Sequence, residues 1–99
     1  MSAPSFNTAQ RRYLKQLAHP LKPLLPMGKE GPSSAFVKQL EEQLEIHELI
    51  KIRILGNCLS DMADIDHALD RAGIFKVQKV GHIMTVFRQR EEDSQIALP

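Results

Sequence analysis

The segment spanning residues 49–55 constrains the fold most strongly, because its apolar and charged side chains alternate. Ile50, Ile52 and Ile54 share one parity, while Lys51 and Arg53 share the other. A period of two residues is typical of a β-strand that buries one face. The segment therefore predicts a strand that must be covered by other elements of the chain.

The remaining apolar residues predict three helices and three further strands around this one. The first strand contains Pro26, which lacks an N–H group and is therefore expected at a sheet edge or an irregular position. Asn7 or Thr8 is expected to cap the first helix, and Ser60 the third. The predicted helices cover about residues 8–18, 33–47 and 60–72, and the other strands cover about 24–27, 75–80 and 83–88.

The resulting order, α-β-α-β-α-β-β, predicts an α/β two-layer sandwich with a mixed four-stranded sheet and an exposed Gly-x-x-Gly loop. The final two strands flank Gly81-His82, a connection suited to a hairpin. A chain of 99 residues accommodates one core. We expect a flexible N-terminus over residues 1–7, a single domain over 8–90 and a flexible C-terminal tail over 91–99.

Charge is segregated along the chain, although the formal net charge is only +1. Residues 1–29 contain five basic residues and no acidic one, whereas residues 30–50 contain five glutamates and one lysine. Such segregation allows one face of a nearly neutral protein to attract a polyanion. The same pattern also arises from ordinary solvated surfaces.

Gly28-Lys29-Glu30-Gly31 lies between the first predicted strand and the second helix. Glycines allow such a loop to approach a bulky ligand closely, and the following helix N-terminus favours phosphate. KH domains hold single-stranded nucleic acid with a loop of this type. Taken alone, however, the tetrapeptide is more typical of a simple tight turn.

The wider sequence resembles the CRM domain, a family named for chloroplast RNA splicing and ribosome maturation. The resemblance rests on residues 17–23 (LAHPLKP), the Gly28–Gly31 loop, residues 46–52 (IHELIKI), and Val80-Gly81 before a strand that ends at Arg88. It covers about residues 6–90 and is greatest to the stand-alone bacterial YhbY-like RNA-binding proteins. Glu30, which weakens the positive charge of the loop, and Pro26, which alters its entry angle, depart from the expected pattern.

The resemblance implies RNA binding and association with precursor rRNA of the large ribosomal subunit. The basic residues that precede the loop are expected to flank it and contact the RNA backbone. Lys51, Arg53 and Arg88 either face RNA or pack beneath helices. The candidate RNA-binding residues are Gly28, Lys29, Glu30, Gly31, Lys22, His19, Arg11, Arg12 and Lys15.

No catalytic residue, metal ligand set or cofactor is predicted. The four histidines are scattered along the chain, and Cys58 is the single cysteine. We expect a cytoplasmic protein that has neither a membrane partner nor a small-molecule substrate. An alternative hypothesis is a protein-interaction adaptor that docks a basic ribosomal protein on the acidic face of the second helix, formed by Glu41, Glu42 and Glu45.

Overall fold

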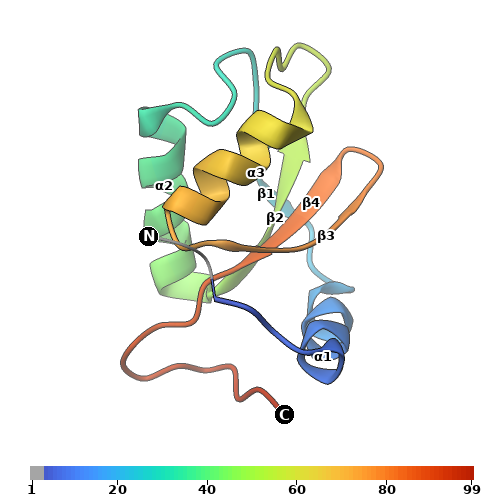
Figure 1. Ribbon diagram of the computed structural model, residues 1–99, viewed down its shortest axis with the longest axis vertical. Coiled ribbons are helices and arrows are strands. Elements are labelled where there is room, and N and C mark those ends of the chain that lie inside the picture. The colour runs from blue at the N-terminus through green and yellow to red at the C-terminus, as the bar shows by residue number, and fades with distance from the viewer. Residues whose placement is uncertain (1–3) are drawn as a thin grey trace.

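The computed structural model describes residues 4–99, and within them the chain forms three helices and four strands in the predicted order (Figure 1). Residues 1–3 of the predicted flexible N-terminus lie outside the described residues. The elements are α1 (Thr8–Ala18), β1 (Pro23–Met27), α2 (Ser34–His47), β2 (Leu49–Ile54), α3 (Met62–Arg71), β3 (Phe75–Val80) and β4 (Ile83–Phe87).

The four strands form one mixed sheet in the order β1-β2-β4-β3. β1 pairs with β2 in parallel, and β4 runs antiparallel to both β2 and β3. β1 therefore lies at an edge, as Pro26 requires, and its register shifts between Pro23 and Leu25. The β3–β4 connection is the predicted hairpin, in which Gly81 has a φ of 60°.

The sheet buries both faces, but to different extents. On one face, Ile50 and Ile52 of β2 pack with Leu40 of α2 and Leu69 of α3 in the larger core cluster. α2 and α3 form the second layer of the predicted sandwich. The opposite face carries a smaller cluster, in which α1 covers only one end of the sheet; its buried members are Leu14, Ala18, Leu49, Val77 and Phe87.

The helix caps follow the local sequence, with one correction. Asn7 and Gln10 form a capping box at the start of α1, and Asn7 Oδ1 accepts a hydrogen bond from the Gln10 N–H at 2.8 Å. The cap of α3 is Asp61, so the prediction of Ser60 was wrong by one residue. Asp61 Oδ1 accepts from the Asp64 N–H at 2.9 Å, an interaction that either residue type can make at a cap.

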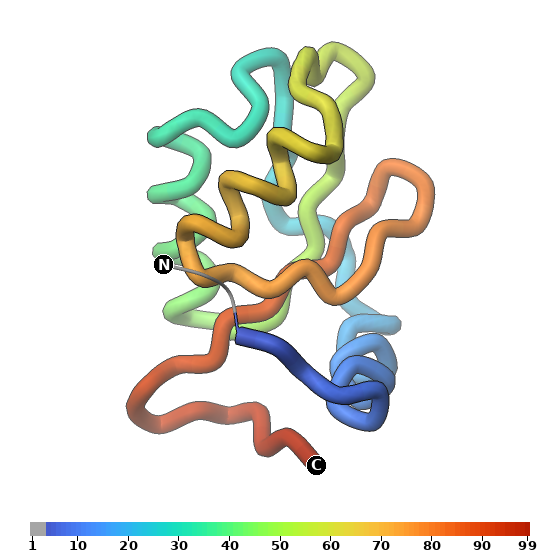
Figure 2. Tube along the Cα trace, viewed as in Figure 1, coloured from blue at the N-terminus to red at the C-terminus, as the bar shows by residue number. Residues whose placement is uncertain are grey.

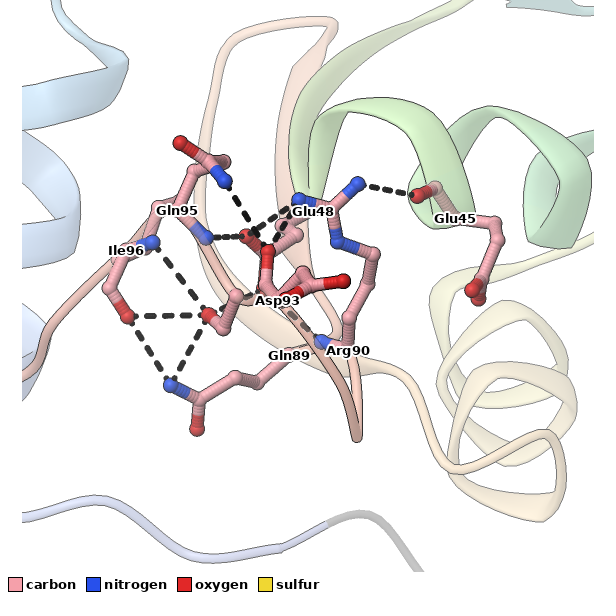
Figure 3. Close-up of polar contacts among 8 residues, drawn as sticks. Glu45, Glu48, Gln89, Arg90, Asp93, Gln95 and Ile96 are labelled. Atoms are coloured by element: carbon pink, nitrogen blue, oxygen red, sulfur yellow. Dashed lines mark hydrogen bonds and ion pairs between the residues drawn. The ribbon is translucent and has the colours of Figure 1, made fainter.

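The C-terminal segment contacts the junction between α2 and β2 through Glu48 (Figure 3). Glu48 is 1% exposed and has a φ of 64°, a left-handed conformation at the end of α2. Its carboxylate accepts hydrogen bonds from the backbone N–H groups of Arg90 (2.8 Å) and Gln95 (2.7 Å) and from Ser94 Oγ (2.6 Å). These contacts hold Ser94 and Gln95 against the end of α2; the flexibility of residues 91–99 stays a prediction.

Candidate nucleic-acid interface

Residues Gly28 to Gly31 form a tight turn between β1 and α2. The Gly31 N–H donates to the Gly28 carbonyl oxygen at 3.0 Å, which closes the turn across four residues. Lys29 and Glu30 occupy its tip and are both exposed. The turn therefore presents one positive and one negative side chain to solvent.

The two glycines of this turn have different structural roles. Gly31 has a φ of 59°, and a Cβ atom there would overlap Ser60 Oγ and lie 3.0 Å from Ser60 Cβ. A Cβ on Gly28 would lie 3.7 Å from Leu55 Cδ1 and 3.8 Å from Asn57 Oδ1, which are ordinary contacts. The fold requires glycine at position 31 but accepts a small side chain at position 28.

The N-terminus of α2 follows the turn closely. Ser33 caps it by accepting a hydrogen bond from the Phe36 N–H at 3.1 Å, and its first turn contains no acidic residue. α3, by contrast, has Asp61 at its cap and Asp64 in its first turn. The positive end of the α2 dipole is therefore available to an anion, whereas that of α3 is already balanced by carboxylates.

The loop between β2 and α3, residues 55–61, lies beside the Gly28–Gly31 turn at the same end of the sheet (Figure 1). The Leu55 N–H donates to the Met27 carbonyl oxygen at 2.9 Å, which joins the two loops at their bases. Leu59 is 79% exposed at this end. The sequence interpretation did not include this loop, although the carboxyl ends of two adjacent parallel strands lie at the same end of the sheet.

The basic residues of α1 lie at the other end of the molecule. Figures 1 and 2 show α1 at the opposite end of the long axis from the loop between β1 and α2. β1 separates them and spans about 16 Å along its five residues. The expectation that the basic segment flanks the turn in space was therefore wrong. Residues that precede a strand and residues that follow it lie at its two ends.

The basic segment forms a surface of its own. Arg11, Arg12 and Lys15 line a shallow groove of about 550 Å³ together with Thr8 and Val77. His19 and Lys22 are exposed between α1 and β1.

The structure places Arg88 on one side of the sheet and Lys51 and Arg53 on the other, which the sequence left open. Arg88 pairs with Glu41 of α2, with Nη1 2.9 Å from Oε2, so this partly exposed arginine lies on the α2 side of the sheet and partly neutralises the acidic α2 face. Lys51 and Arg53 have the opposite parity to Ile50 and Ile52, so they lie on the face that α2 and α3 do not cover. Arg53 is exposed, and Lys51 is half-buried.

The described residues show no other candidate chemistry. Across residues 4–99, no three His, Cys, Asp or Glu side chains gather as possible metal ligands. In the same part of the chain, no helix has the length and hydropathy needed to cross a bilayer.

The fold and the turn together define a small α/β domain with a Gly-x-x-Gly connection from an edge strand to a helix. The model of the CRS1 / YhbY (CRM) domain family matches residues 6–88. The chain belongs to this family, as its sequence motifs indicated.

Three similar proteins share this domain over nearly their whole length. The Probable RNA-binding protein YqeI of Bacillus subtilis is 37% identical over 91 residues, covering 91% of this chain and 95% of YqeI. An RNA-binding protein of Haemophilus influenzae is 34% identical over 96 residues, covering 96% of each chain. The solution structure of SAV1595 from Staphylococcus aureus, described as a candidate RNA-binding protein, matches with a TM-score of 0.77 and 33% identity, covering 96% of this chain and 100% of SAV1595.

Proposed function

We propose that this protein binds RNA without catalysing a reaction, and that the Gly28–Gly31 turn and the N-terminus of α2 form its primary contact. Its membership of the CRM family and the RNA-binding relatives support RNA as the ligand. One observation carries the choice of site: the turn leads directly into a helix N-terminus whose first turn contains no acidic residue. An RNA phosphate there gains both N–H donors and a favourable dipole.

The composition of the turn defines how it binds. Lys29 and Glu30 cancel in formal charge, so the turn contributes mainly backbone donors and close approach. Gly28 contributes by having no side chain, which leaves the backbone of the turn accessible; the fold itself does not require glycine at that position. Long-range attraction must then come from basic residues elsewhere on the surface.

We further propose that the target is precursor rRNA of the large ribosomal subunit, bound in the cytoplasm without a cofactor. The resemblance to stand-alone CRM proteins supports this target. The turn contains no side chain arranged to read several base edges, which favours recognition of RNA shape and backbone.

A filter-binding titration at low salt tests the primary contact. Gly28→Ala fits the fold and adds a methyl group between the turn and the neighbouring loop, which narrows the proposed backbone contact, so we expect about a tenfold loss of affinity. Lys29→Glu, which converts a neutral turn into one with two negative charges, should weaken binding at least as much.

Lys38→Glu is the matched control for charge, because Lys38 is exposed on α2 beyond its first turn. We expect a smaller loss for it than for Lys29→Glu. If Gly28→Ala and Lys29→Glu both bind RNA as tightly as the wild-type protein, the turn is not the contact site.

A further inference from the structure

The sheet face that carries Lys51 and Arg53 is covered by α1 at one end only. Residues on this face form rows across the strands, because paired residues in a sheet point to the same side. One row consists of Pro26, Arg53, Ile83 and Val80, and it lies nearest the Gly28–Gly31 turn. Arg53 is exposed, and Val80 is 66% exposed.

The next two rows lead away from the turn toward α1. Lys51 pairs with Pro23 on one side and Thr85 on the other, and its Nζ lies 3.5 Å from the His19 carbonyl oxygen. Beyond it, Leu49 pairs with Phe87, and α1 buries both. The open face therefore begins beside the turn at Arg53 and narrows at the Lys51 row, where Lys51 is half-buried and Thr85 is only 1% exposed.

The charge of this face is of one sign. The four strands contain no acidic residue, and α1 and residues 19–22 also contain none. Among the described residues, neither Lys51 nor Arg53 forms an ion pair with a carboxylate. Lys76, which points to the other face, is by contrast paired with Asp66 at 2.9 Å.

We propose that a single strand of RNA leaves the Gly28–Gly31 turn, crosses this open face over Arg53 and Lys51, and ends at the basic surface of α1. The inference rests on the proposed RNA binding and extends it, because it joins two sites that lie at opposite ends of the molecule. Charge complementarity selects a polyanion. The surface between Arg53 on β2 and Lys22 beside α1 carries basic and neutral side chains only.

The apolar side chains beside Arg53 select single-stranded RNA. Val80 and Ile83 lie in the same row as Arg53 and expose apolar surface that the faces of unstacked bases can contact. A duplex presents phosphates and groove edges and keeps its base faces stacked. This face contains no exposed aromatic residue, so we expect weak base preference.

An oligomer-length experiment tests this path with uridine oligomers of about four and about twelve nucleotides, a range typical of small single-strand binding domains. The variant is Lys51→Gln/Arg53→Gln, and the matched control is Lys38→Gln/Arg71→Gln, which removes two exposed charges from α2 and α3. For the longer oligomer we expect the variant to lose about tenfold in affinity and about 1.4 in the slope of log affinity against log salt. For the shorter oligomer, and for the control, we expect changes below about twofold.

The outcomes separate this path from the primary contact. If Lys51→Gln/Arg53→Gln binds the longer oligomer with the same affinity and salt slope as the wild-type protein, the path is overturned. If Gly28→Ala still weakened both oligomers, the proposed function would stand without it. The assignment to a single strand would be overturned if the protein bound a duplex of the same length as tightly as the single strand and the variant lost the same affinity for both.

Discussion

Replacing Glu48 tests the polar network that joins the C-terminal segment to the end of α2. The carboxylate accepts three hydrogen bonds of 2.6–2.8 Å, and Glu48 is 1% exposed. A hydrogen bond to a charged group contributes about 1.5–3 kcal/mol, but the freed donors near the surface regain water. We therefore expect Glu48→Ala to lower the free energy of unfolding by about 3 kcal/mol, roughly 12–24 °C in Tm.

The backbone at this position allows the hydrogen-bond contribution to be separated from strain. Because φ is 64°, both Glu and Ala are strained there, whereas Gly is not. Glu48→Gly should therefore be less destabilising than Glu48→Ala by about 1 kcal/mol. Urea unfolding monitored by far-UV circular dichroism measures both differences.

The effect of Glu48 should also depend on pH. Burial raises the pKa of Glu48, but hydrogen bonds from Ser94, Arg90 and Gln95 and the charge of Arg90 outweigh burial and hold the pKa below its ordinary value of 4.5. A lowered folded-state pKa stabilises the protein above about pH 4.5, and this stabilisation is lost as pH falls through the folded-state value. The stability gap between the wild-type protein and Glu48→Gln should therefore narrow on acidification. A gap below about 1 kcal/mol at pH 7, or one independent of pH, would refute this reasoning.

Three further substitutions test separate parts of the structure. Gly31→Ala should lower the free energy of unfolding by about 2 kcal/mol and Gly28→Ala by less than about 0.5 kcal/mol, as measured by urea unfolding; equal effects would contradict their different environments. Arg88→Ala should cost at most about 1 kcal/mol, because its ion pair with Glu41 is half exposed, and a double-mutant cycle with Glu41→Ala measures this coupling. Phe6→Ala should cost about 2 kcal/mol, because its ring makes edge contacts with two other rings at centroid distances of 4.7 and 5.6 Å; an unchanged Tm would show that the N-terminal segment does not pack there.

Local sequence patterns predicted most of the fold. The alternation around Ile52 defined β2. Pro26 predicted that β1 lies at an edge or is irregular, and β1 is both an edge strand and shifted in register. Alternation and proline restrict the backbone within a few residues, so tertiary contacts do not change the structure that they predict. The cap of α3 was wrong by one position because Ser60 and Asp61 are adjacent and both suit a cap.

The candidate site was harder to predict, because its parts are joined by the fold rather than by sequence proximity. The basic residues of α1 are near the Gly28–Gly31 turn in sequence, but β1 carries the chain away from them. Arg53 lies between the two sites because β2 pairs with β1, a relation that alternation alone does not specify. The environment of Glu48 depends on residues more than 40 positions away and had no local signal.

Photo-crosslinking of the wild-type protein to RNA that contains 4-thiouridine tests the RNA-binding surface most directly. Mass spectrometry of the crosslinked peptides identifies the contacting residues without any substitution. We expect crosslinks in residues 28–34 and on β2 at Lys51 and Arg53. Crosslinks confined to the exposed faces of α2 and α3, where Glu42 and Asp64 lie, would contradict the proposed RNA-binding surface.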